Sequence, residues 1–322
     1  MGDHLRIMSL DRSGIIKGRR LLTKQNKQNK QNKQNLLPVT ALLGGAVIWG
    51  LLWYPYRLLE QAQVSGSIAT TITYFIALLL GLASFRKDLR MSHIAGGEPY
   101  LLLGIGLFAG WTNLAYVLGV IHGEVMRVLL LFYLAPLWTI VFSRLLLKEK
   151  LSLHGYLVMG LSLAGAATML WEPESGSLLP TSYGDWMGLS AGFMFALSNV
   201  LSRKDQYHNI QLKSVAVWMG VVLMGLIYSL FLPDLSILSD ISPDAYVLLS
   251  GLGIVIFVLS VAVQYGLTHV PANRAIVIML FELVVAAVAA YLLTDEAMTL
   301  KEWIGGAMIV FASLFSVRMN RE

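Results

Sequence analysis

Ten apolar, charge-poor segments fill the chain from residue 38 onward and constrain its fold more than any other feature. Each is close to the roughly 20 residues that an α-helix needs to cross a hydrocarbon layer of about 30 Å. They lie at residues 38–57, 66–84, 99–121, 125–147, 152–171, 185–202, 213–232, 245–267, 271–293 and 301–318. The longest connections, 172–184 and 233–244, are too short to hold a separate domain. The pattern predicts an all-α membrane protein with ten transmembrane helices.

The charged residues are few and unevenly distributed. Only 13% of the chain is charged and 56% is hydrophobic, whereas about a quarter of the residues of a soluble domain are charged. Of the net charge of +5, the first 35 residues carry +7 and the remainder −2, so the folded part offers no basic surface for nucleic acid. Residues 1–37 contain a Lys, Gln and Asn repeat and are predicted to be a disordered basic cytoplasmic tail.

The connections between the apolar segments indicate the orientation in the membrane, because Lys and Arg are retained on the cytoplasmic side during insertion. With the N-terminus inside, 21 basic residues are cytoplasmic and three are outside: Arg57, Arg127 and Lys301. Without the tail the balance is still 12 to 3. Both termini, including residues 319–322, are therefore expected in the cytoplasm.

The chain contains an internal repeat. A shift of 147 positions superposes spans 3 to 5 on spans 8 to 10 without a gap, and it places His122 on His269, Arg127 on Arg274 and Glu149 on Glu296. The repeats, residues 38–171 and 185–318, have five spans each. Because five is odd, the second repeat must enter the membrane from the opposite side. Inverted repeats around a midplane site are typical of carriers that open alternately to either side.

Short motifs fall at matching places in the two repeats, and together they resemble a known family. They are Arg127-x8-Pro136, the run from Leu147 to Ser152, Phe281-Glu282-Leu283, the run from Leu293 to Thr299, and Trp49-Gly50. Over residues 38 to 318 the chain resembles the EamA-type branch of the drug/metabolite transporter superfamily.

The resemblance implies ten helices in two inverted five-helix bundles. It also implies secondary transport of amino acids or other small metabolites, commonly as export, across a bacterial inner membrane. The family often has proline after the glutamate of span 9, where this chain has Leu283. We therefore expect helix 9 to be straighter than helix 4, which keeps Pro136.

Glu282 is the ionisable residue placed nearest the bilayer midplane. A carboxylate at that depth costs several kcal/mol unless it is partnered or neutralised, so such residues normally face a cavity. Removal from water disfavours the charged form, which would let Glu282 act as a proton carrier as well as a substrate contact. The alternative is a hydrogen bond between helices that only fixes their packing.

Other polar and aromatic residues within the spans are candidates for a central pocket. In the resembled family helices 1, 3, 4, 6, 8 and 9 surround the cavity. The candidates on these helices are Trp49, Trp111, Asn113, Tyr133, Asn199 and Gln264. Aromatic walls suit an amphiphilic or aromatic metabolite. The alternative is that these side chains pack between helices.

Two arginines and two glutamates flank spans 4 and 9. Arg127 and Arg274 begin these spans from opposite faces, and Glu149 and Glu296 end them. One Arg and one Glu at each membrane surface would suit gates that break and re-form. Alternatively, the two glutamates stabilise the N-termini of helices 5 and 10, where a negative charge is favoured.

The sequence argues against most enzyme chemistry. Gly188-Leu189-Ser190-Ala191-Gly192 spells a serine nucleophile motif, but all six histidines lie in the tail or at span ends, so no base is expected beside Ser190. No P-loop occurs, and one midplane acid cannot complete a metal coordination shell. The absence of cysteine excludes disulfides and thiolate metal sites. We expect no enzyme activity, no cofactor, no metal and no nucleic-acid partner.

These features together predict a secondary carrier in the inner membrane. We expect it to export a small organic metabolite, such as an amino acid, by alternating access with proton coupling. A passive facilitator or channel, which would lack a coupling residue, and an intramembrane enzyme remain alternatives. The expected partners are the small-molecule substrate and the lipid bilayer, and the sequence leaves the oligomeric state open.

Overall fold

The structure of the protein is a computed structural model that describes residues 36–123, 125–171, 180–231, 242–293 and 299–316. Almost all of the expected tail, residues 1–35, lies outside the described residues, as do residues 319–322 and Glu296. Within the described ranges the secondary structure is entirely helical.

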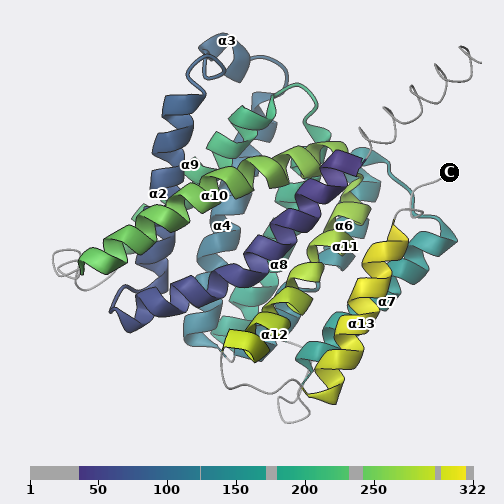
Figure 1. Cartoon of the computed structure of the whole chain (residues 1–322). Helices are drawn as coiled ribbons and strands as arrows, with labels where there is room; N and C mark the ends of the chain where they lie inside the picture. The colour runs from purple at the N-terminus through teal and green to yellow at the C-terminus, as the bar shows by residue number, and fades with distance from the viewer. Residues whose placement is uncertain (1–35, 124, 172–179, 232–241, 294–298, 317–322) are drawn as a thin grey trace, which may run out of the picture.

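Helices occupy all ten predicted segments (Figure 1). They are Leu36–Gln61, α2 (Gly66–Ser84), α4 (Pro99–His122), the series α5 (Val125–Phe132), α6 (Ala135–Phe142) and the π-helix η1 (Ser143–Leu147), α7 (Leu153–Leu170), α8 (Tyr183–Lys204), α9 (Ile210–Ser229), α10 (Pro243–His269), the pair α11 (Ala272–Met279) and α12 (Phe281–Leu293), and α13 (Leu300–Phe315). A short helix, α3 (Met91–Ile94), lies in the connection after α2. Seven helices of the described part are long and apolar enough to cross a membrane by length and composition.

Polar side chains fix where several helices begin. The Ser182 hydroxyl accepts a hydrogen bond from the Asp185 amide at 3.1 Å, and the Asp185 carboxylate accepts one from the Ser182 amide at 3.1 Å, which together form a capping box at the start of α8. Ser152 and Asn209 cap α7 and α9 through the amides of Gly155 and Leu212. The positions of these capping residues in the sequence therefore set the limits of the spans.

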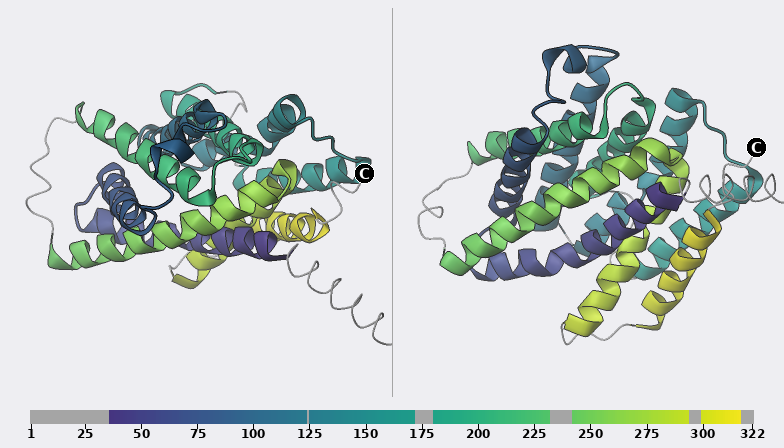
Figure 2. Two further views of the ribbon diagram at one scale, coloured as in Figure 1. Left: turned by 90° about the horizontal axis from the view of Figure 1, so that it is seen from above. Right: turned by 45° about the horizontal axis from the view of Figure 1, so that its top comes forward.

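The two repeats pack against each other through contacts between the third helix of one and the first helix of the other. A Cβ on Gly119 of α4 would lie 3.3 Å from the backbone of Gly184 and Gly188 in α8. Its repeat partner, Gly266 of α10, lies against the Leu36–Gln61 helix, where a Cβ would meet Leu42 at 2.4 Å. The third helix of each repeat thus packs on the first helix of the other, and Figures 1 and 2 show α10 running alongside the first helix.

Helices α7 and α13, the last of each repeat, form a separate pair at one side of the bundle (Figure 1). A Cβ on Gly165 would lie 2.7 Å from the carbonyl oxygen of Gly305, so the two backbones are in direct contact. Here equivalent helices of the two repeats meet, unlike the contacts between a third and a first helix. The all-α fold with two inverted five-helix repeats is as predicted.

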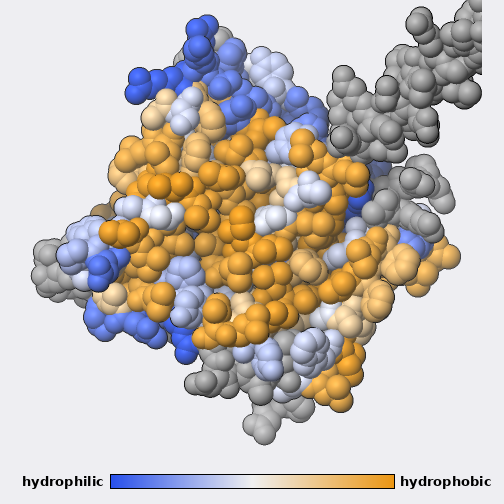
Figure 3. All heavy atoms as spheres, in the orientation of Figure 1, coloured by the Kyte–Doolittle hydropathy of each residue, from blue (hydrophilic) through white to orange (hydrophobic). Residues whose placement is uncertain are grey.

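The outer surface carries a broad apolar zone. In Figure 3 hydrophobic residues cover the middle of the visible face, whereas hydrophilic residues gather near α3 and at the opposite edge. Large apolar side chains such as Leu145, Leu157 and Val247 are 66–73% exposed. Such a surface is stable only against lipid, since soluble proteins rarely expose apolar patches this large. The chain is a multi-pass membrane protein.

The connections 85–98, 148–152 and 205–209 lie together at one end of the bundle, which we call the basic end. Asn209 donates a hydrogen bond to Asp88 at 2.8 Å, and the His208 ring is 3.3 Å from the Ile94 carbonyl. A buried hydrogen bond between Nδ1 of His208 and the Asp205 carboxylate, 2.8 Å long, holds the turn between α8 and α9. The connection 148–152 belongs to the first repeat and 205–209 to the second, so the two repeats contact each other at this end.

Both helix 4 and helix 9 are interrupted near their middle. Helix 4 breaks for two residues, Tyr133 and Leu134, just before Pro136, whose ring nitrogen has no hydrogen to continue the ladder. Helix 9 breaks for one residue, Leu280, where the Leu283 amide bonds the Leu280 carbonyl in a tightened turn. The expectation of a straighter helix 9 therefore holds only in degree: without proline the break is shorter, but it is present.

Candidate functional site

The two broken helices meet at a hydrogen bond between the repeats. The hydroxyl of Tyr133, at the break of helix 4, donates to Oε1 of Glu282, which lies in the first turn of α12 directly after the break of helix 9. The two residues are 149 positions apart in the sequence. A break in each repeat thus places one polar side chain at a shared central position.

A small cavity surrounds this hydrogen bond. Its volume is about 10 Å³, enough for about one water molecule. Its lining comes from helices 4, 6 and 9: Phe132, Tyr133, Ala135, Pro136, Phe195, Ile276, Met279, Leu280 and Glu282. The site is therefore closed in this conformation, and its walls are apolar apart from one phenol and one carboxyl group.

Two glycines let neighbouring helices approach the breaks. A Cβ on Gly50 of the first helix would lie 2.7 Å from the Glu282 carbonyl oxygen. A Cβ on Gly192 of α8 would lie 2.3 Å from the Phe132 carbonyl oxygen. Each glycine sits on the first helix of one repeat and contacts the broken helix of the other. Gly50 belongs to the Trp49-Gly50 motif, which indicates why that motif carries a glycine.

Aromatic rings pack around the cavity from three helices. Phe132 lies edge-on to Tyr133 with ring centroids 5.1 Å apart, and it contacts Tyr116 of α4 at 5.3 Å and Phe195 of α8 at 5.4 Å. Such geometries add to the stability gained from burial. Sequence reasoning named Tyr133 but missed Tyr116, Phe132 and Phe195, because aromatic residues are common in membrane spans and give no signal of their depth or facing.

Of the predicted substrate-binding residues, only Tyr133 and Glu282 line this cavity. The Trp111 indole nitrogen donates to the Ser190 hydroxyl at 3.2 Å, and Asn113 donates to the Ala109 carbonyl of its own helix at 3.0 Å. Trp49 is half-buried and packs against the main apolar core. Trp111 thus joins α4 to α8 and Trp49 packs against the core, whereas the Asn113 bond stays within α4.

Asn199 of α8 and Gln264 of α10 are buried away from the cavity lining. Their exposed fractions are 8% and 6%, and Nδ2 of Asn199 and Oε1 of Gln264 have no hydrogen-bond partner within the described part of the protein. Each lies five residues before the end of its helix at the basic end. They therefore occupy a level between the central cavity and the basic end.

An ion pair joins the repeats at the basic end. Glu149 lies 3.5 Å from Nε of Arg203 and accepts a hydrogen bond from the Ala272 amide, at the start of α11, at 3.2 Å. Arg203 also donates to the Thr268 carbonyl at 2.7 Å. Glu149, the predicted gating residue, thus contacts both α8 and α11, and we call the Glu149, Arg203, Thr268 and Ala272 contacts the basic-end lock.

Of the other predicted gating residues, the structure describes the side chain of Arg274 alone. Arg274 lies in α11, and its Nε has no partner among the described residues. Arg127 begins helix 4 within α5, where its side chain is not described, and Glu296 lies outside the described residues. Sequence reasoning paired Glu149 with Arg274 by repeat symmetry. It missed Arg203, whose only sequence signal is a basic residue in the last turn of α8.

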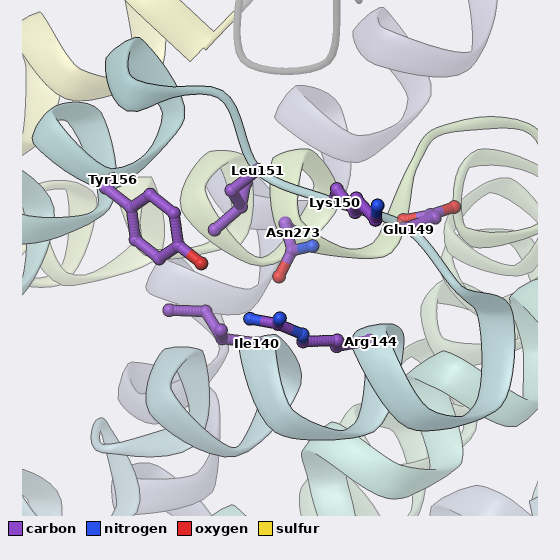
Figure 4. A pocket seen from close by; sticks show the side chains of 7 residues that line it. All are labelled: Ile140, Arg144, Glu149, Lys150, Leu151, Tyr156 and Asn273. Atoms are coloured by element: carbon purple, nitrogen blue, oxygen red, sulfur yellow. The ribbon is translucent and has the colours of Figure 1, made fainter.

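A second cavity of about 230 Å³ lies beside the lock. It is lined by Ile140, Arg144, Glu149, Lys150, Leu151, Tyr156 and Asn273. In Figure 4 Arg144 and Asn273 approach each other across it, and Glu149 and Lys150 lie at its edge. The Asn273 amide donates to the Ser143 hydroxyl at 2.8 Å, so helices 4 and 9 are also joined here. Over the described ranges, no three His, Asp or Glu side chains gather as a metal site would require.

Comparisons with known proteins agree with this architecture. The model of the EamA-like transporter family matches residues 36–171 and again residues 182–318. A protein of Archaeoglobus fulgidus, named an uncharacterized transporter, is 29% identical over 69% of this chain and 78% of its own length. An uncharacterized transporter of Pseudomonas aeruginosa is 26% identical over 58% of this chain and 61% of its own length.

A solved crystal structure shares the fold. It superposes with a TM-score of 0.69 and 19% sequence identity, over 89% of this chain and 98% of the other. Together with two successive matches to one family model, each covering one five-helix repeat, this leads to one conclusion. The chain belongs to the EamA-like transporter family.

Proposed function

We propose that this protein is a secondary carrier that moves a small organic solute by alternating access, with Tyr133 and Glu282 at its central site. The observation that carries the proposal is the hydrogen bond between these two residues. It joins the broken helices of two inverted repeats at a closed cavity, which is where carriers of this architecture place their substrate.

The basic-end lock would be the cytoplasmic gate. The excess of Lys and Arg in the connections at this end favours a cytoplasmic position, with both termini inside and the carrier in the inner membrane. The Glu149 and Arg203 side chains are 19% and 27% exposed, so water can compete for this pair when the helices separate. A lock of this kind would close one side of the central site while the other side opens.

Glu282 would couple transport to the proton gradient, in the direction of export. Among the residues that line the central cavity, Glu282 carries the only carboxyl group. A group that binds either a proton or a substrate, but releases one to take the other, links their movements. The collapsed cavity and the locked basic end favour this mechanism over a passive pore, which needs a continuous path.

The test begins with purified protein in a thermal-shift screen against amino acids, nucleosides, sugars and cationic drugs. A ligand that binds the folded state raises its melting temperature. A hit is then followed in proteoliposomes by counterflow and by uptake driven by an imposed pH gradient. We expect both activities in the unaltered protein, and we expect Glu282→Gln to abolish the pH-driven component.

The matched control is Glu60→Gln, because Glu60 is an exposed acid at the end of the first helix. It should leave transport unchanged. Undiminished pH-driven uptake by folded Glu282→Gln would remove this residue from the coupling mechanism. Solute flux without counterflow would instead indicate a channel.

A further inference from the structure

The polar groups that line the central cavity include an acid but no base. Of its nine lining residues, only Tyr133 and Glu282 have an oxygen atom in the side chain that can form a hydrogen bond. The phenol can donate or accept, whereas an ionised carboxylate only accepts. None of the lining residues is a lysine, arginine or histidine. A ligand in this site therefore meets at most one full charge from the lining, and that charge is negative.

Three basic side chains that the structure describes, those of Lys213, Arg203 and Arg274, are engaged elsewhere or remote from the cavity. Lys213 donates to the Ser202 carbonyl at 2.8 Å and to the Thr268 hydroxyl at 3.2 Å, and Arg203 belongs to the basic-end lock. Arg274 is the basic residue nearest to Glu282 along helix 9. It lies eight residues earlier, about 12 Å at the rise of an α-helix. No described cation is therefore placed to neutralise a substrate carboxylate beside Glu282.

The helix breaks also provide no site for an anion, although a helix N-terminus often does. At the start of α6, Pro136 has no amide hydrogen and the Leu137 amide already bonds the Leu134 carbonyl at 2.9 Å. At the start of α12, the Leu283 amide bonds the Leu280 carbonyl at 3.1 Å, and Glu282 itself lies in the first turn. A carboxylate placed here would find the Tyr133 hydroxyl as the one side-chain donor among the lining residues and would face another acid.

We propose that the substrate is a small organic cation, an amine with an apolar or aromatic body and no carboxylate. This rests on the proposed function and names the substrate class of the same site. The ammonium group binds the Glu282 carboxylate, which Tyr133 now occupies as a donor. The body of the ligand lies beside Phe132 and Phe195, whose aromatic faces attract a cation.

A zwitterionic amino acid is disfavoured by the same chemistry. Its ammonium group would find Glu282, but its carboxylate would be buried with a neutral phenol, Tyr133, and no cation among the lining residues. The cavity of about 10 Å³ must also widen for any organic ligand, so binding belongs to a conformation in which one end of the bundle opens.

Three probes test the proposal: phenylalanine, 2-phenylethylamine, which lacks the carboxylate of phenylalanine, and 3-phenylpropionate, which lacks its ammonium group. Their binding to the purified full-length protein is measured by calorimetric titration, in the unaltered protein, Glu282→Gln and the control Glu60→Gln. We expect the amine to bind at least about 10-fold more tightly than either carboxylate-containing probe. Glu282→Gln should weaken amine binding about 10- to 100-fold, the range for loss of a hydrogen bond to a charged group.

The outcomes separate the substrate class from the transport activity. Amine binding that is absent, no tighter than that of phenylalanine, or unchanged in folded Glu282→Gln would overturn the amine proposal. Counterflow of phenylalanine through Glu282 would overturn it while leaving the carrier proposal intact. Amine binding at Glu282 without any exchange across a vesicle membrane would support the substrate class and contradict the carrier.

Discussion

At the scale of single residues, the hydrogen bond from Tyr133 to Glu282 has a double consequence. It satisfies a carboxyl group that would otherwise be costly to bury, and it ties the two repeats together at their centre. Sequence reasoning named both residues, Glu282 because an acid at mid-span is rare and Tyr133 as one of the aromatic residues within the spans. It could not find their pairing, which depends on where two helices break.

Tyr133→Phe tests this pair without removing its ring. The variant keeps the packing against Phe132 but leaves the Glu282 carboxyl group without its donor. We expect the free energy of unfolding to fall by about 1–3 kcal/mol, because a buried acceptor is left unsatisfied. The measurement is the melting temperature in detergent.

The matched control for this variant is Tyr100→Phe, since Tyr100 is 59% exposed at the start of α4. It should change the melting temperature little. Equal stability of Tyr133→Phe and the unaltered protein would indicate that the hydrogen bond contributes nothing to the fold. Transport by Tyr133→Phe should fall less than transport by Glu282→Gln, because the carboxyl group remains.

At the scale of helices, close backbone contacts hold the breaks in place. Gly50 and Gly192 bring the first helix of each repeat against the interrupted helix of the other. Ten apolar stretches and a 147-residue shift were enough to predict the spans and the inverted repeat. The break at Leu280 was not predictable in the same way, because no proline marks it and tertiary packing sets its position.

Gly50→Ala should destabilise the protein by about 1–3 kcal/mol, the usual cost of overpacking. The added methyl group would lie 2.7 Å from the Glu282 carbonyl oxygen and 2.8 Å from Val285, so the two helices must separate. Gly44→Ala on the same helix is the control, since nothing lies within 4 Å of its Cβ position.

In Gly44→Ala we expect unchanged or slightly higher stability, because alanine favours a helix by up to about 1 kcal/mol over glycine. Melting temperatures of both variants in the same detergent decide the matter. Equal destabilisation by both substitutions would mean that helix propensity or the membrane environment, and not the contact at Glu282, accounts for the effect.

At the scale of the whole molecule, contacts join the two repeats at the basic end, and the central cavity has a volume of only about 10 Å³. The lock joins the end of helix 4 to helices 6, 8 and 9, which belong to the other repeat. Asn199 and Gln264 lie at a level beneath it, with polar atoms that lack a partner in the described structure. Opening this end would expose them to water.

Arg203→Ala should favour that opening. Loss of its contacts with Glu149 and the Thr268 carbonyl is expected to cost the closed state about 1–2 kcal/mol, which corresponds to about a 5- to 30-fold change in the opening equilibrium. Because the chain has no cysteine, Asn199→Cys provides a single reporter. Its reaction with an impermeant maleimide in inside-out vesicles should accelerate by a similar factor.

Arg86→Ala is the matched control, because Arg86 is an exposed basic residue at the same end but outside the lock. It should leave the labelling rate unchanged. Equal acceleration by both substitutions, or none by Arg203→Ala, would contradict a gating role for the lock. The lock partner Arg203 was missed from the sequence because many basic residues crowd this end, and only tertiary structure selects one of them.

The exchanged packing of the repeats bears on how such a protein can arise. Gly119 and Gly266 are equivalent residues, and each lies where its helix packs against the first helix of the other repeat. If one repeat were made alone, these glycine-lined faces would be uncovered, because the helices that pack on them belong to the other repeat. The product of an ancestral gene for one repeat would thus need to insert into the membrane in both orientations and to form antiparallel dimers. Gene fusion would then have joined the two copies in one chain.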